Sequence, residues 1–186
     1  MATERQPEII LYDLACIKNI CFSPVVWKIR LMLNYKCIPY KTIFLEFPDI
    51  EPKLKELARS AVGPAFRISV TPRENLILSP RAQEYFRAKN EARMGCKLED
   101  LMNTEKEKKT WQAVADKMSE LSDLMLTNKD KGPFLLGEKP SYTDFFIAAS
   151  LQSARTIDEE IFQRCAAYPG FKAIYDGCIP WMETKN

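Results

Sequence analysis

The sequence predicts a mixed fold, in which a small α/β unit precedes a larger all-helical unit. Near the N-terminus, an apolar run at residues 8–14 and an alternating run at residues 41–47 flank a stretch with helical spacing. From Ser79 onward, every periodic stretch has helical spacing instead. We therefore expect two domains, which span residues 1–65 and residues 66–186.

The first unit has the order strand, helix, strand. The run at 8–14 suits a strand covered on both faces. Ser23 is a favourable N-cap and Pro24 suits the first helical position, so a helix should begin here and reach about Lys36. Residues 41–47 then alternate as a strand does. Because such a crossover is almost always right-handed, the two strands should form a parallel pair.

After a short helix expected at 53–59, the second unit contains helices with recognisable start signals. These signals are Ser79-Pro80 for a helix to Met94, Thr104 with Glu107 for a helix ended by Gly132-Pro133, Ser141 with Asp144 for a helix at 145–155, Asp158 for a helix to Ala167, and Pro169 for a helix to Asp176. In the helix that begins at Thr104, apolar residues recur from Trp111 to Met125 at steps of three and four, which predicts one inward face. The helix at 145–155 is apolar nearly all round and should be central.

The composition excludes several classes of function. The 186 residues include 27 Lys and Arg against 25 Asp and Glu, a net charge of +2 that predicts neither nucleic-acid nor membrane binding. The chain has no His, which excludes Ser-His and Cys-His nucleophile pairs and His-based zinc sites. Its six Cys form no C-x-x-C pair, so we expect free thiols, no metal centre and a cytoplasmic location. The N-terminal residues also lack an apolar signal core.

Three stretches of the chain resemble glutathione S-transferases of a fungal branch that is related to Ser-type and β-etherase-like enzymes. They are residues 23–36 with the following 38–40 and 47–50, residues 79–87, and residues 132–137 with 141–145. The resemblance covers most of the chain. It implies a shortened thioredoxin-like unit followed by a transferase-type helical domain, with glutathione as the cofactor.

One part of the family pattern is missing. Family members follow the second strand and helix with a hairpin entered through a cis-proline, and then with a helix begun by an acidic residue and Ser. Residues 65–78 are too few for these parts, and position 78 is Leu. We therefore expect that the hairpin and its helix are deleted, together with about half of the glutathione site. A two-stranded pair leaves an open edge and apolar faces, so we expect a homodimer that covers them.

The resemblance makes Ser23 the candidate catalytic residue. Free N–H groups and the helix dipole stabilise an anion at the start of a helix, and a Ser hydroxyl there can donate a hydrogen bond to a thiolate. The alternative is that Ser23 acts only as an N-cap, and both roles are compatible. Cys21 is a second possible nucleophile, although a lone Cys is more often a small buried hydrophobe.

The resemblance also implies residues for the two substrates. The glutathione side comprises Ser23, Val25, Trp27 and Lys28, where Lys28 either attracts a glutathione carboxylate or is an ordinary surface Lys. Six residues are candidates for an apolar second-substrate cleft, or else for the core: Tyr12, Leu14, Phe22, Tyr85, Met94 and Trp181.

The expected function is that of a glutathione-dependent enzyme of fungal secondary metabolism. The Ser23-stabilised thiolate would add to an electron-poor olefin or epoxide of an apolar small molecule. If the addition reverses after bond rotation, the result is trans/cis isomerisation, and the compact chain resembles transferase-like isomerases of this kind. The alternatives are ordinary glutathione conjugation, or a non-catalytic carrier of hydrophobic ligands or interaction protein.

Overall fold

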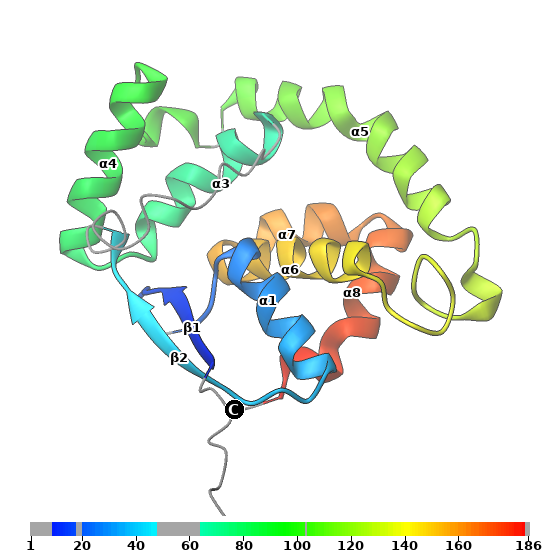
Figure 1. Ribbon diagram of the computed structural model, residues 1–186. Coiled ribbons are helices and arrows are strands. Elements are labelled where there is room, and N and C mark those ends of the chain that lie inside the picture. Colours follow the sequence, from blue (N-terminus) through cyan, green and yellow to red (C-terminus); the bar gives the residue numbers. More distant parts are fainter. Residues whose placement is uncertain (1–8, 18–19, 48–63, 103, 185–186) are drawn as a thin grey trace, which may run out of the picture.

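The computed structural model describes residues 9–17, 20–47, 64–102 and 104–184 (Figure 1). The helix expected at 53–59 lies outside them. The elements are, in chain order, β1 (Ile9–Leu14), α1 (Pro24–Tyr35), β2 (Tyr40–Leu45), α3 (Pro64–Leu76), α4 (Pro80–Met94), η1 (Glu99–Leu101), α5 (Glu105–Met125), η2 (Lys129–Lys131), α6 (Tyr142–Ile157), α7 (Glu159–Ala166) and α8 (Pro169–Met182).

The strand, helix and strand expected at the N-terminus are confirmed. β1 and β2 pair in parallel, from Ile9 opposite Tyr40 to Leu14 opposite Leu45, and α1 connects them. Under α1 the sheet carries a partly buried ion pair, in which Arg30 Nη2 lies 3.1 Å from Oδ2 of the buried Asp13. The same guanidinium donates to the hydroxyls of Tyr40 and Thr42, so it ties α1 to both strands.

The expectation that β1 is covered on both faces is wrong. Leu11 and Asp13 point to one face of the sheet and are buried. Ile10 and Tyr12 point to the other face and are 43% and 41% exposed. Strand side chains alternate between the two faces of a sheet, and α1 covers one of them. The outer apolar face of β1 therefore remains accessible.

The central position of α6 is confirmed. Eight of its residues are buried, and six of these belong to the main hydrophobic core with residues of α1, α7 and α8. Its start is fixed by the expected pair: Asp144 accepts hydrogen bonds from the N–H and the hydroxyl of Ser141, and the Ser141 hydroxyl accepts the N–H of Asp144. Asp144 also accepts the N–H of Leu135 at 2.9 Å, so it holds the preceding loop against α6.

Helix α3 is a difference from the sequence-based expectation, which places no helix at residues 64–76. The helix continues through a buried Pro72, which has no N–H for the backbone ladder. Its neighbour Arg73 is also buried and binds Glu107 of α5 at 2.9 Å and Asp158 at the start of α7 at 2.9 Å. Contacts between distant segments therefore stabilise a helix that local propensity disfavours.

Helix α5 begins at the predicted cap but ends at Met125, before the expected stop at Gly132-Pro133, and its predicted inward face is only partly buried. It is anchored at both ends: Trp111 Nε1 donates to Ser69 Oγ of α3, and Ser122 Oγ accepts the N–H of Gly170 in α8. Between these anchors it arches away from α6 and α7 (Figure 1), and Leu121 is 37% exposed. The Thr104 cap is present, but the Glu107 carboxylate turns to Arg73.

Helix α8 is longer than expected, because Gly177 and Pro180 do not end it. Gly177 lies inside the helix at a close approach to Phe134, where an added Cβ would be 2.9 Å from the ring. Pro180 stands in the last turn, where few intrahelical bonds remain to be broken. Gly177 is therefore explained by its close packing against Phe134, and Pro180 by its position near the end of the helix; neither residue stops α8.

Candidate functional site

Ser23 occupies the N-cap of α1, as predicted. Its Oγ accepts the N–H of Val26 at 3.4 Å, and its backbone carbonyl accepts the N–H of Trp27 at 2.9 Å. Pro24 takes the first helical position, where its lack of an N–H costs nothing. Since the hydroxyl accepts the cap hydrogen bond, its own proton remains available for donation. The cap and donor roles can therefore coexist at Ser23.

The first turn of α1 also offers an electropositive end. As the second helical residue, Val25 has an N–H without an intrahelical acceptor, and its side chain is 39% exposed. The turn contains no acidic residue that would neutralise the helix dipole. The start of α1 therefore combines the hydroxyl of Ser23, a residue that is 7% exposed, with the N–H of Val25 and the positive end of the helix dipole.

Cys21 is poorly suited to be the nucleophile. Its thiol is buried and donates weakly to the Ser23 carbonyl, with an S···O distance of 3.9 Å. Burial raises the pKa of this thiol far above its usual value, and the nearby Asp13 carboxylate raises it further, while Arg30 opposes the shift. The small-hydrophobe interpretation of Cys21 is thus the one that the structure supports.

Trp27 supports the site from beneath and does not reach into it. The residue is 7% exposed and belongs to the main core. Its indole Nε1 donates to the Cys21 carbonyl at 2.9 Å, which holds the loop before Ser23. The expected contact with glutathione is therefore corrected: Trp27 points inward because it occupies the buried stripe of α1.

Lys28 leans toward α6 instead of standing free in solvent. Its ammonium lies 4.7 Å from the centroid of the Phe146 ring and 5.9 Å from that of Tyr142. Such contacts orient a cation without neutralising it.

The structure brings together three of the six residues expected around the second substrate. Leu14, Phe22 and Met94 pack into one cluster beside the start of α1, together with Leu78 and Phe86, which sequence reasoning did not select. Phe22 is 1% exposed, so in this structure it is a core residue and does not line an open cleft. Phe22 precedes Ser23 directly in the sequence and so connects this cluster to the start of α1.

The other three candidates lie elsewhere. Trp181 packs against Tyr35 at the C-terminal end of α1, with ring centroids 5.3 Å apart, and therefore at the opposite end of that helix from Ser23. Tyr12 is on the outer face of the sheet. Tyr85 is half-buried on α4 and takes a cation contact from Lys89.

The start of α4 is a neighbour of the Ser23 loop that sequence reasoning missed. The N–H of Ile17 donates to the Ile77 carbonyl at 2.8 Å, so the segment before α4 lies against the loop after β1. Ser79 caps α4 and donates its hydroxyl to Glu46 Oε1 at 2.7 Å. The Ser-Pro signal predicted this helix start, but not its place beside the loop.

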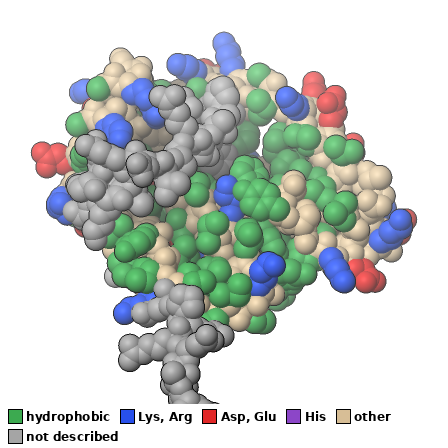
Figure 2. Space-filling view, in the orientation of Figure 1, with side chains coloured by type: hydrophobic (Ala, Val, Ile, Leu, Met, Phe, Trp, Pro, Cys, Tyr) green, Lys and Arg blue, Asp and Glu red, His purple; other side chains and the backbone are tan. Residues whose placement is uncertain are grey.

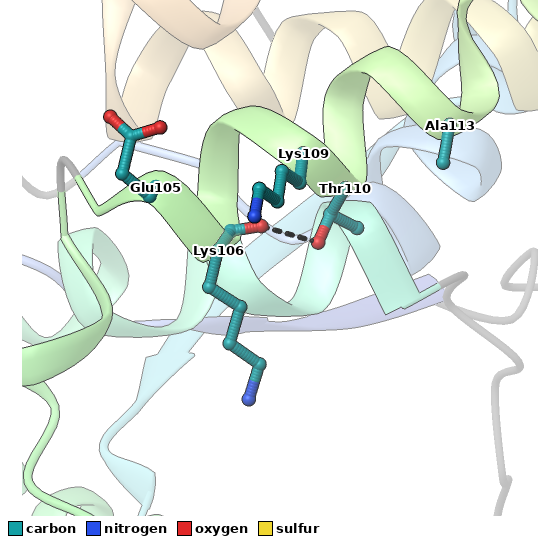
Figure 3. A pocket seen from close by; sticks show the side chains of 5 residues that line it. All are labelled: Glu105, Lys106, Lys109, Thr110 and Ala113. Atoms are coloured by element: carbon teal, nitrogen blue, oxygen red, sulfur yellow. Dashed lines mark hydrogen bonds between the residues drawn. The ribbon is translucent and has the colours of Figure 1, made fainter.

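A shallow pocket lies away from Ser23, along α5. It is lined by Glu105, Lys106, Lys109, Thr110 and Ala113 (Figure 3). The Thr110 hydroxyl donates its proton to the Lys106 carbonyl at 2.7 Å. All five lining residues belong to one helix, so no polar groups from different elements converge on a ligand in this pocket.

The described ranges hold no group of three potential metal ligands. They also hold no helix that is both long and apolar enough to cross a bilayer.

Comparison with known proteins identifies the family. Residues 54–168, more than half of the chain, match the family of the glutathione S-transferase C-terminal domain. The chain therefore belongs to the glutathione S-transferases. It is 23% identical to the glutathione S-transferase-like protein ustS of Aspergillus flavus, over 89% of this chain and 86% of that protein. Their alignment spans 240 residues, which exceeds the length of this chain, so the relative contains stretches that this chain lacks.

Solved structures agree in fold. A glutathione S-transferase of Ceriporiopsis subvermispora, crystallised with glutathione, superposes with a TM-score of 0.80 at 20% identity and covers 97% of this chain and 100% of its own. A second transferase of that fungus, also with glutathione, gives 0.73 at 21% identity over 94% and 97%. GSTFuA3 of Phanerochaete chrysosporium gives 0.70 at 20% identity over 97% and 99%. The predicted fold class, a truncated thioredoxin-like unit followed by a transferase-type helical domain, is confirmed.

Proposed function

We propose that this protein is a glutathione-dependent enzyme, in which the start of α1 stabilises the glutathione thiolate. The observation that carries the proposal is Ser23, whose Oγ accepts the cap hydrogen bond and keeps its proton for the sulfur. Val25 contributes its N–H, and Trp27 positions the loop through the Cys21 carbonyl. Structures of the same fold with bound glutathione support the choice of cofactor.

The thiolate then attacks an electron-poor double bond or an epoxide of an apolar substrate. With an enone, a bond forms between sulfur and the β-carbon, and the π electrons move to the carbonyl oxygen as an enolate. The former double bond can rotate in this adduct. If the enolate expels the thiolate, the double bond returns in the other geometry and glutathione is regenerated; if a proton traps the enolate, the product is a conjugate.

Calorimetric titration of glutathione tests the first step. Wild type should bind saturably, and Ser23→Asp should lose binding, because Asp preserves the N-cap acceptor but repels a thiolate. Ser119→Ala, on the exposed side of α5, is the matched control and should bind as wild type does. Absence of binding up to about 10 mM would contradict the proposal and favour a non-catalytic carrier.

Proton NMR with dimethyl maleate and glutathione distinguishes the two reactions. Isomerisation would convert the maleate to the fumarate while the titre of free thiol stays constant. Conjugation would consume thiol in step with the olefin. Turnover of neither kind, in a protein that binds glutathione, would contradict the addition chemistry.

We also propose a homodimer that covers the outer face of the two-stranded sheet. Ile10 and Tyr12 on this face are each more than 40% exposed. In Figure 2, hydrophobic side chains gather over the centre of the molecule's face, while Lys and Arg lie mostly toward its rim. A monomeric mass in sedimentation at micromolar concentration would contradict a dimer.

A further inference from the structure

Lys28 lies between α1 and α6 with aromatic rings as neighbours. Its Nζ is 4.7 Å from the centroid of Phe146 and 5.9 Å from that of Tyr142, which stand one turn apart on α6. No carboxylate of the described residues lies within ion-pair distance of this ammonium. Lys28 is therefore an oriented cation whose charge no described carboxylate neutralises.

The two rings are unusually exposed for their size. Tyr142 is 59% exposed and Phe146 44% exposed, although α6 is otherwise the central helix. On α1, Val25 and Ile29 flank Lys28 and are 39% and 43% exposed. A surface that combines one unpaired cation with flat apolar area suits a ligand with both properties.

We propose that Lys28, Tyr142 and Phe146 bind the acid end of a flat, conjugated carboxylic acid, which is the second substrate of the enzyme. A carboxylate pairs with the ammonium and also meets the positive edges of the rings, while the conjugated part lies on the ring faces and on Val25. A neutral ligand could form no ion pair with the Lys28 ammonium. A phosphate is less suited, because the cluster provides one cation and no bidentate guanidinium.

The position of this cluster along α1 limits the length of the substrate. Lys28 is five residues beyond Ser23, which corresponds to about 7.5 Å along the helix axis and about 140° around it. The reacting carbon must therefore be remote from the carboxylate. A para-substituted benzoate with an enone side chain has this arrangement. This identification of the substrate class rests on the proposed function.

The test compares 4-(3-oxobut-1-enyl)benzoate with the corresponding benzamide, each titrated into the full chain. The acid should bind at least tenfold more tightly than the amide. Lys28→Gln should abolish this preference and Lys28→Arg should retain it, whereas Phe146→Ala should weaken both ligands. Lys36→Gln replaces an exposed Lys at the C-cap of the same helix; it is the charge-matched control and should preserve the preference.

Several results would overturn the proposal. These are equal binding of acid and amide by wild type, an unchanged preference in Lys28→Gln, and no binding of the acid up to about 10 mM. Loss of glutathione binding instead of acid binding in Lys28→Gln would assign Lys28 to glutathione. Because the acid is titrated without glutathione, and Ser23→Asp is tested with glutathione alone, failure of this inference is distinguishable from failure of the proposed function.

Discussion

Two of the six cysteines, Cys37 and Cys96, reach solvent, whereas Cys16, Cys21, Cys165 and Cys178 are buried. Burial raises the pKa of Cys165 to about 11 and that of Cys178 to about 12, and it raises the pKa of Cys21 further still. Buried thiols of this kind are unreactive at neutral pH.

We predict that Ellman's reagent modifies two thiols of the native protein rapidly and the other four only after unfolding. Burial protects all four of these thiols sterically. Because the thiolate is the reacting species, the raised pKa of Cys21, Cys165 and Cys178 protects these three further. Mass mapping of peptides identifies the modified residues. Rapid modification of Cys21 would restore it as a candidate nucleophile.

Glu74 on α3 carries the largest carboxyl shift among the described residues, because burial raises its pKa from 4.5 to about 8. Between these two values the folded protein holds the proton more often than the unfolded chain does. The free energy of unfolding should therefore fall as pH rises from 5 to about 8. Urea denaturation at several pH values measures this slope, and Glu74→Gln should flatten it. An equal slope in the variant would exclude Glu74 as its cause.

At the scale of single elements, Cys37 just after α1 has a strained backbone conformation that a substitution can relieve. Cys37 has a positive φ of 53°, and the N–H of Ile38 donates to the Leu33 carbonyl at 2.9 Å, as in a Schellman cap. Glycine adopts this conformation without a steric penalty. We predict that Cys37→Gly raises the free energy of unfolding by about 1 kcal/mol. Cys37→Ala removes the same thiol but keeps Cβ, and it should give no such gain.

The second prediction at this scale concerns the buried ion pair between Arg73 of α3 and Glu107 of α5. Arg73→Met leaves Glu107 buried without that partner, which should lower stability by about 3–5 kcal/mol in urea denaturation. Adding Glu107→Leu should recover much of the loss, because the isolated charge is then gone. If the double variant is as unstable as the single one, Asp158 or the packing of α3 dominates instead.

Local signals predicted most of these elements, and their failures have identifiable causes. Ser23, Ser79, Thr104, Ser141 and Asp158 each begin a helix, because a cap depends on neighbours within three residues. Helix α3 could not be predicted in this way: its stability comes from Arg73, whose partners are distant in the sequence. The exposed side of α5 likewise depends on where its two ends are anchored.

At the scale of the whole molecule, the fold class and the role of Ser23 as a cap followed from the sequence, but the surroundings of Ser23 did not. Trp27 and Trp181 were both expected near a ligand. The first turned out to be core and the second lies at the other end of α1, because spacing does not reveal which helix packs against which face. The partners of Lys28 on α6 were hidden for the same reason.

The central claim is that the start of α1 stabilises a glutathione thiolate. It is tested most directly by the pKa of the glutathione thiol in the complex, followed through the ultraviolet absorbance of the thiolate. The account predicts a pKa below that of free glutathione in wild type, and no such shift with Ser23→Asp at any glutathione concentration. Bound glutathione with an unshifted thiol pKa in wild type would contradict it.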